Sequence, residues 1–198
     1  MSMMVAPHRF AAIAATGALN PLDTSPDIAL SNSNRTATST FSQWRSSRSI
    51  TAHSAGQYYL EWTYNAGGDG ILGFMDSAAS LATYVGSSAD SAGYRPVYMA
   101  WYGTAAGGLA SAPVAGDIIC VAINLNTRKF WVRLNGGYWN GSAANDPVTG
   151  VGGASLGTNM TAAVYAAISV QIVGQQWTLN TGQAAFAQAM PSGHVAWG

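Results

Sequence analysis

The chain has 198 residues, enough for one domain with a sizeable buried core, and 48% of them are hydrophobic while only 8% are charged. Eight basic and eight acidic residues give a formal net charge of zero, which excludes the basic surface that a nucleic-acid-binding domain needs. No apolar run approaches the roughly 18 residues of a membrane-spanning helix, and the single cysteine excludes an internal disulfide.

The first 26 residues differ from the rest of the chain and are predicted to form an N-terminal arm, followed by one folded domain over residues 27–198. Residues 10–19 are apolar, but they lack the basic start and long apolar core of a secretory signal. Pro21 and Pro26 mark the entry to the domain. Two interpretations of the arm stay open: it docks on a neighbouring protein, or it is a disordered leader.

From residue 28 onward, hydrophobic residues recur with a period of two, which indicates β-strands rather than helices. In the clearest strand, one face carries Tyr58, Leu60, Trp62 and Tyr64. The opposite face carries Glu61, the only glutamate in the chain, which we expect to face outward or to pair with an arginine. Further strands are predicted at residues 70–75, 97–102, 116–125, 130–134, 162–171 and 175–179, with at most one short helical turn at 77–84.

These short strands and turn-rich connections predict an all-β fold, specifically a two-layer antiparallel β-sandwich with long loops. The most secure element is a hairpin in which residues 116–125 and 130–134 are joined by a turn at Asn126 and Thr127. Two connections, residues 86–96 and 135–161, are longer than such a fold needs. Loops of that length in compact domains are either functional or disordered.

Aromatic residues in or beside those two loops are the candidate ligand-binding residues. Tyrosine and tryptophan offer rigid contact area, and their rings stack on the apolar face of a sugar. Arginine and asparagine beside them supply planar hydrogen-bond donors. The predicted binding set is Tyr94, Arg95, Tyr98, Tyr138, Trp139 and Asn140. The alternative is that these rings pack beneath their own loops, and the sequence leaves both interpretations open.

The sequence favours no catalytic residue, no metal site and no cofactor. Asp117 follows a glycine at a strand entrance, where a carboxylate commonly accepts backbone N–H bonds. Cys120 lies in mid-strand and is predicted to be a small buried residue rather than a reactive thiol. The histidines, His8, His53 and His194, lie far apart, and the aspartates lack the spacing of a calcium loop.

Over residues 116–141, GDIICVAINLNTRKFWVRLNGGYWNG, the chain resembles a known family. The segment resembles the central signature of SPRY (B30.2-like) domains, in which Gly-Asp opens a strand and a short turn leads to an aromatic strand ending in Asn-Gly. The segments AGQYYLEWTY, GILGF and FAQAMPSGHVAW resemble other pieces of that family and follow its order. The resemblance covers residues 28–197 and implies a sandwich of the SPRY/concanavalin-like jelly-roll type. The chain departs from the family pattern at Cys120, where glycine is common, and at Asn124, where aspartate is frequent.

The NGGYWNG loop, residues 135–141, looks most like versions found in bacteriophage and prophage virion proteins. This likeness implies a non-enzymatic binding module, attached to a capsid or tail, that contacts a host-surface glycan during adsorption. We expect it in the virion, as a homo-oligomer, bound to other virion proteins through the N-terminal arm. The alternative is a purely structural decoration or tail-tip subunit that binds neighbouring virion proteins. A glycan-cleaving enzyme is the weakest alternative, because it would need two convergent aspartates flanking a groove.

Overall fold

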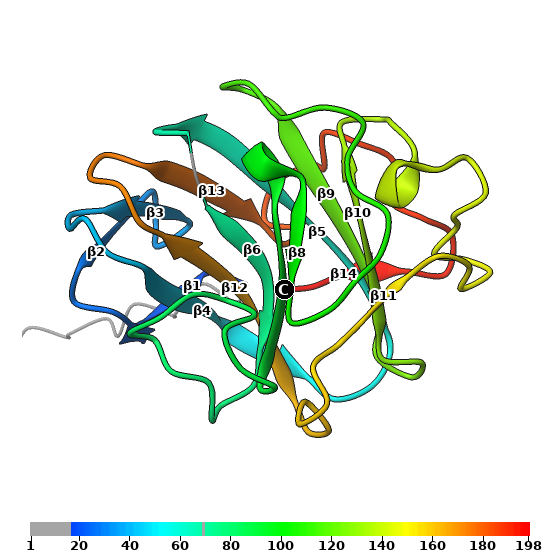
Figure 1. Ribbon diagram of the computed structural model, residues 1–198, viewed down its shortest axis with the longest axis horizontal. Helices are drawn as coiled ribbons and strands as arrows, with labels where there is room; N and C mark the ends of the chain where they lie inside the picture. The colour runs from blue at the N-terminus through cyan, green and yellow to red at the C-terminus, as the bar shows by residue number, and fades with distance from the viewer. Residues whose placement is uncertain (1–16, 69) are drawn as a thin grey trace, which may run out of the picture.

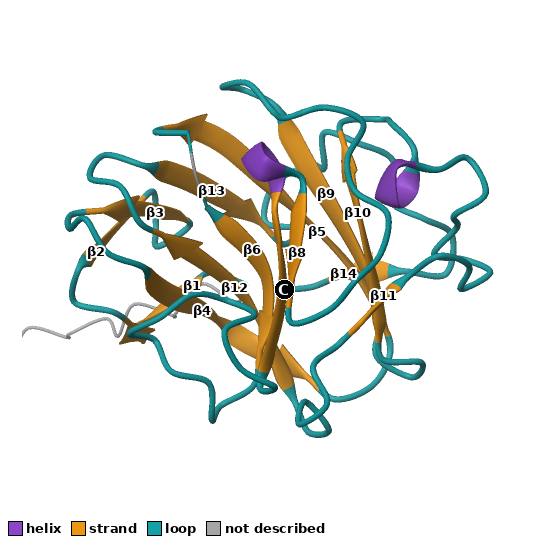
Figure 2. Cartoon of the chain, in the orientation of Figure 1, coloured by secondary structure: helices purple, strands orange, loops and turns teal. Residues whose placement is uncertain are grey.

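The structure, a computed structural model, describes residues 17–68 and 70–198 as two packed β-sheets joined by loops (Figures 1 and 2). Those residues contain no α-helix, only two short 3₁₀ turns, η1 at Pro96–Tyr98 and η2 at Trp139–Gly141. The predicted all-β, two-layer antiparallel sandwich is therefore confirmed.

The smaller sheet, sheet A, has six strands, and all of its neighbouring strands are antiparallel. Their order across the sheet is β1 (Leu19–Thr24), β4 (Arg45–His53), β12 (Val164–Val170), β6 (Ile71–Met75), β7 (Ser91–Arg95) and β8 (Ala100–Tyr102). Because β1 and β8 each have one neighbour in this order, they are the two edge strands of sheet A.

The larger sheet, sheet B, has eight strands. Their order is β11 (Ala154–Ser155), β10 (Lys129–Leu134), β9 (Ile118–Asn124), β5 (Gln57–Ala66), β13 (Gln176–Asn180), β3 (Thr36–Ser39) and β2 (Ile28–Ser31), with β14 (Val195–Ala196) parallel to β5. The β9–β10 pair runs without a register shift from Lys129 opposite Asn124 to Leu134 opposite Ile119. The predicted hairpin is confirmed.

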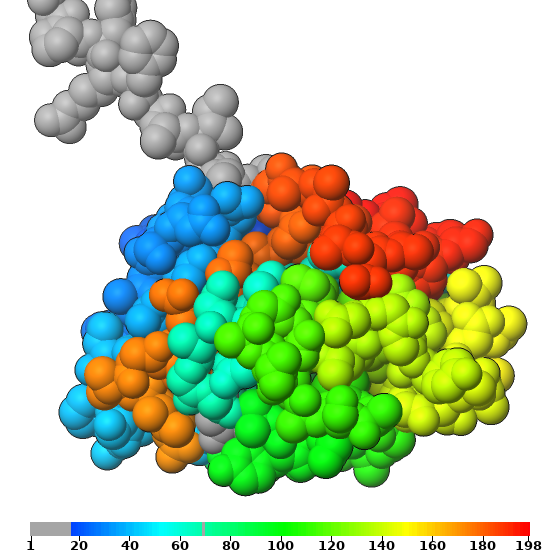
Figure 3. Space-filling model, turned by 90° about the horizontal axis from the view of Figure 1, so that it is seen from above, coloured from blue at the N-terminus to red at the C-terminus, as the bar shows by residue number. Residues whose placement is uncertain are grey.

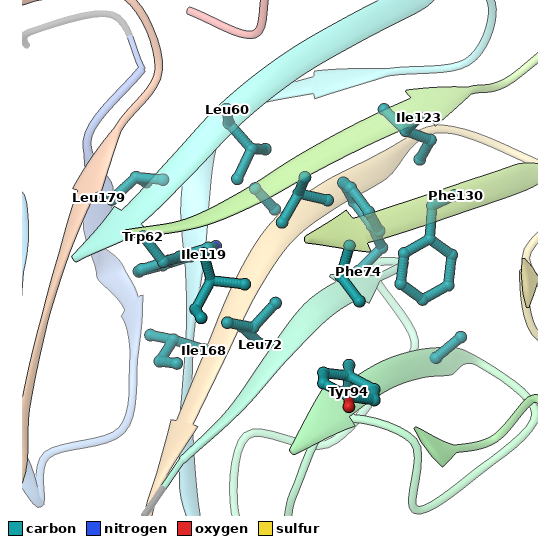
Figure 4. Packing of buried hydrophobic residues seen from close by; sticks show 14 of the residues in the cluster. Leu60, Trp62, Leu72, Phe74, Tyr94, Ile119, Ile123, Phe130, Ile168 and Leu179 are labelled. Atoms are coloured by element: carbon teal, nitrogen blue, oxygen red, sulfur yellow. The ribbon is translucent and has the colours of Figure 1, made fainter. Parts of the chain in front are cut away.

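The main core lies between the sheets and follows the two-residue alternation of the strands. Figure 4 shows Leu60, Trp62 and Ile119 of sheet B facing Leu72, Phe74 and Ile168 of sheet A. These side chains are almost completely buried. Removing a side chain of this size from water stabilises a fold by roughly 1.5–3 kcal/mol, so this alternation sets the register of both sheets.

The outer face of sheet B is also buried, which the alternation alone does not predict. Tyr59, Cys120 and Trp131 form a second cluster on that face, covered by Trp139 and Phe186 from later segments. Glu61 shares the face and is 2% exposed. Its carboxylate accepts hydrogen bonds from the Tyr59 hydroxyl and from two backbone N–H groups of residues 187 and 188. The expected outward or arginine-paired position of Glu61 is wrong, whereas the burial of Cys120 is confirmed.

Two other local expectations differ from the structure. Strand β1 pairs with β4, so residues 19–24 belong to sheet A although they fall in the predicted arm; residues 1–16 of that arm lie outside the described residues. Residues 97–102 are not one strand, because Pro96 opens η1 and Met99 takes a left-handed conformation with φ of 50° before β8 begins. Residues 77–84 form turns and no helix, in agreement with the expectation of at most one short turn there.

Candidate binding site

The antiparallel register of sheet A brings several strand ends into one row. Val170 lies opposite Arg45, the preceding residue Ser169 lies opposite Ile71, and Arg95 lies opposite Ala100. The loops that join β3 to β4, β7 to β8 and β12 to β13 therefore gather at the same end of the sandwich. Figure 3 views the molecule from above and shows green, teal and orange segments, far apart in the sequence, side by side on this surface.

A long segment, residues 76–90, lies over the outer face of sheet A. The backbone N–H of Val85 donates to the Ser169 hydroxyl at 2.8 Å, and the N–H of Ser46 donates to the carbonyl of Leu81 at 2.9 Å. Gly93 makes this close approach possible, because a Cβ at that position would lie 2.8 Å from a methyl carbon of Val85. The segment thereby holds Tyr84 above the sheet.

A pocket of about 220 Å³ opens at this place, and we call its five lining residues the aromatic cup. They are Trp44, Ile71, Tyr84, Arg95 and Tyr102. Ile71, Arg95 and Tyr102 come from β6, β7 and β8, whereas Trp44 comes from the β3–β4 loop and Tyr84 from the covering segment. The cup thus combines a rigid sheet with two loop residues, as binding sites in β-sandwiches commonly do.

Four of the lining residues form the wall of the cup, and each contacts the next in a closed ring. These wall residues are Trp44, Tyr84, Tyr102 and Arg95. The ring centroids of Trp44 and Tyr84 are 5.8 Å apart, and those of Tyr84 and Tyr102 are 5.4 Å apart with the planes at 75°. Arg95 Nη1 donates to the Tyr102 hydroxyl oxygen at 3.3 Å, and the Arg95 guanidinium carbon lies 5.1 Å from the Trp44 ring centroid. Ile71, which is almost completely buried, is the fifth lining residue.

Tyr98 lies next to the cup and fixes its arginine. The Arg95 guanidinium carbon is 3.9 Å from the Tyr98 ring centroid, so the cation stacks on this ring as well as contacting Trp44. Tyr98 is 61% exposed, so it also presents an aromatic surface to solvent at the rim. The structure therefore brings two of the six predicted binding residues, Arg95 and Tyr98, into one site.

Tyr94 does not belong to this site. The prediction that it lies in a loop is wrong. It belongs to β7, where successive side chains alternate, so Arg95 faces outward and Tyr94 points into the core (Figure 4). Tyr94 is completely buried, and its hydroxyl oxygen accepts the backbone N–H of Leu109 at 2.7 Å. Burial raises the pKa of this phenol. Tyr94 anchors the loop after β8, and a ligand on the surface does not reach it.

The other three predicted residues lie around η2, after β10. Trp139 and Asn140 are buried, and the Asn140 side chain accepts from the N–H of Val132 and donates to the carbonyl of Gly152, both at 2.8 Å. Trp139 packs under its own loop, with the Arg133 guanidinium carbon 4.3 Å from its ring centroid. Tyr138 is 67% exposed. Trp139 and Asn140 therefore pack within their own loop and do not form a binding surface. Tyr138, which is exposed, remains a predicted ligand contact.

Sequence reasoning missed four residues of the cup, namely Ile71 and the three aromatic residues Trp44, Tyr84 and Tyr102. Trp44 and Tyr84 each follow a polar turn segment. An aromatic residue beside a turn was the criterion for candidates in the two long loops, and the same criterion applied to these shorter segments would have found both residues. Tyr102 was missed because the sequence predicts a single strand over residues 97–102, whereas β8 begins only at Ala100. Its outward direction follows from the pairing of Tyr102 with Gly93, which lies on the outer face.

The acidic and sulfur-containing groups elsewhere have structural partners. Asp117 accepts the backbone N–H of Val114 at 2.8 Å and the side-chain amide of Asn135 at 2.9 Å, which confirms its expected structural role. Burial raises the pKa of the Cys120 thiol, which keeps it protonated at neutral pH. Within residues 17–68 and 70–198, no group of three or more histidine, cysteine, aspartate or glutamate side chains could hold a metal ion. The same residues contain no helix long and apolar enough to cross a bilayer.

Comparison with known proteins identifies the fold. No protein-family model and no curated protein sequence matches the chain. Among solved structures, the SPRY domain of human HERC1 is similar with a TM-score of 0.59 and 12% identity, over 84% of this chain and 99% of that one. Stonustoxin is similar with a TM-score of 0.57 and 16% identity, over 83% of this chain and 27% of that one. The chain therefore has a SPRY-like fold, and at these identities the likeness extends to the fold alone.

Proposed function

We propose that the chain is a non-enzymatic binding module of a bacteriophage virion and that it contacts a host-surface glycan through the aromatic cup. The observation that carries the proposal is the closed wall of Trp44, Tyr84, Arg95 and Tyr102 at a loop-bearing end of a rigid sandwich. Aromatic rings bind the apolar faces of sugars, and tyrosine hydroxyl and guanidinium groups bind sugar hydroxyls. The virion context is supported by the likeness of residues 135–141 to loops of phage proteins.

An array of bacterial surface polysaccharides tests this function. The full chain should bind a subset of them, and Trp44→Ala should weaken that binding by about 30-fold, the effect of losing a central contact worth about 2 kcal/mol. Phe41→Ala is the matched control, because Phe41 lies in the same loop and is exposed but does not line the cup. Thermal unfolding should verify that both variants fold. Absence of binding to any polysaccharide, or equal loss in both variants, would contradict the proposal.

A second candidate, a structural virion subunit that binds neighbouring virion proteins, is favoured by one observation. Leu22 is 97% exposed on β1, an edge strand of sheet A close to the start of the described residues. An apolar side chain on an exposed strand edge is a common point of association between chains.

Native mass spectrometry of the full chain separates the two candidates. The structural role predicts a stable oligomer that Leu22→Lys dissociates, without any effect of Trp44→Ala. A monomer at micromolar concentration, with polysaccharide binding that depends on Trp44, would rule out the structural role.

A further inference from the structure

We infer that the aromatic cup takes a single terminal sugar ring, entering end-on, and that it excludes the interior of a polysaccharide chain. The inference rests on the proposed function and adds which part of a glycan the site binds.

The shape of the cup carries the first step. A groove that binds the interior of a polymer is open at two ends, so that the chain enters at one and leaves at the other. Here each wall residue contacts the next, from Trp44 to Tyr84, from Tyr84 to Tyr102, from Tyr102 to Arg95 and back to Trp44. Beneath the walls, Ile71 packs on a buried cluster that includes Val85. A ligand would therefore reach the cup through its solvent-facing side.

The size of the cup gives the second step. Its volume of about 220 Å³ is smaller than the roughly 300–1,000 Å³ of pockets that hold drug-sized ligands. The space suits one six-membered ring and leaves a second sugar outside. The neighbouring Tyr98, exposed at the rim, is the nearest aromatic surface for that second unit.

The chemistry of the walls gives the third step. Three aromatic rings provide apolar contact for the C–H faces of a pyranose ring, and they are already packed against one another, so little side-chain entropy is lost on binding. Arg95 is held in place by Tyr98, Trp44 and Tyr102, so its cation is part of the preformed wall. A positive charge in the wall disfavours cationic sugars and suits both neutral hexoses and hexuronic acids.

A length series tests the inference. Oligosaccharides of two, four and eight units with the same non-reducing terminus, prepared from a polysaccharide that binds on the array, are titrated into the full chain by calorimetry. End-on binding predicts one protein per oligosaccharide and affinities that agree within about threefold, because the added units lie outside the cup. An affinity that rises tenfold or more with length, or two proteins on the eight-unit chain, would overturn the inference.

Variants and small ligands complete the test. Trp44→Ala and Tyr84→Ala should each reduce the affinity for the two-unit ligand by about 30-fold, while Phe41→Ala leaves it unchanged. Methyl glycopyranosides of glucose and of glucuronic acid, as competitors, distinguish a neutral from an acidic terminal ring. If polysaccharide binds but neither methyl glycoside nor any other methyl pyranoside competes, the end-on inference fails and the proposed function stands. If no polysaccharide binds at all, the proposed function itself fails.

Discussion

Single side chains decide where the loops of this protein lie. Asn140 shows this most clearly, because its amide joins two backbone groups, the N–H of Val132 and the carbonyl of Gly152, from the two sides of one long loop. Its φ of 44° is left-handed, a conformation that asparagine adopts more readily than most residues. Asn140, which the sequence suggests as a ligand-binding amide, therefore stabilises its own loop.

We expect Asn140→Ala to lower the free energy of unfolding by about 2–4 kcal/mol, because each buried backbone group left without a partner costs about 1–3 kcal/mol. Urea denaturation measures this change. Tyr138→Ala, two residues away and exposed, should change stability by less than about 0.5 kcal/mol. Equal effects of the two substitutions would show that the bonds of Asn140 contribute nothing.

Buried titratable groups on the outer face of sheet B predict a loss of stability at alkaline pH. Burial raises the pKa of Cys120 above its ordinary 9.0 and that of Tyr59 above its ordinary 10.0. The folded state therefore holds these protons more tightly than the unfolded state does. Their contribution is complete below about pH 9 and is lost as the pH rises above it. Urea midpoints from pH 7 to pH 10.5 should fall above pH 9, less steeply in Cys120→Ala; parallel curves for the two proteins would contradict this cause.

At the level of elements, segments that carry few strand-forming residues nevertheless cover and extend both sheets. The last residues of the chain cross the outer face of sheet B, where Glu61 accepts the N–H groups of Ala187 and Gln188, and Arg133 donates to the carbonyl of Ala189. A carboxylate that accepts backbone N–H groups acts here as an anchor for an irregular segment.

Replacing that anchor should release the segment. In Glu61→Gln one acceptor oxygen becomes an N–H donor that faces N–H groups, so we expect hydrogen exchange at Ala187 and Gln188 to accelerate about tenfold or more. Amides of the β9–β10 hairpin serve as the internal control, since they bond within the sheet. Unchanged exchange at residues 187 and 188 would mean that other contacts hold the segment.

Elements with strong alternation were predictable from the sequence, and those without it were not. Strand β5 and the β9–β10 hairpin have the expected alternation. Strand β7, with the sequence SAGYR, has small residues that are weak strand formers, so the sequence predicts a loop there. That single difference misplaced Tyr94. The aromatic cup was only partly predictable, because Trp44 and Tyr84 meet Arg95 through sheet register and a covering segment, which no local pattern encodes.

On the scale of the whole molecule, the first and last described residues lie side by side and are joined through Thr181. Trp197 lies in the main core, where its ring centroid is 5.4 Å from that of Phe74 and 5.5 Å from that of Tyr58. Its backbone N–H donates to the carbonyl of Tyr59. Gly198 donates to the carbonyl of Thr181, whose hydroxyl donates to the carbonyl of Gly17. The sandwich is thus completed only when its last strand is in place.

We therefore expect Trp197→Ala to destabilise the entire domain by about 3–5 kcal/mol, the usual cost of removing a buried tryptophan. Guanidinium unfolding followed by fluorescence and by circular dichroism should show one shared transition at lower denaturant. Separate transitions for the two probes would instead indicate that the C-terminal strand unfolds on its own.

The SPRY-like sandwich is shared with proteins at 12% and 16% identity, so the features that set a function must lie in the loops and the residues they present. In the described part of this chain, loops and strand ends together present the aromatic cup around Arg95.

The most direct test of this account is a nuclear magnetic resonance titration of the labelled full chain with a polysaccharide fragment that binds on the array. The account predicts that the indole N–H signal of Trp44 and the backbone signals of Tyr84, Arg95 and Tyr102 shift together, with the buried indole of Trp131 unchanged. Shifts centred on residues 136–141, with the Trp44 signal unmoved, would contradict it.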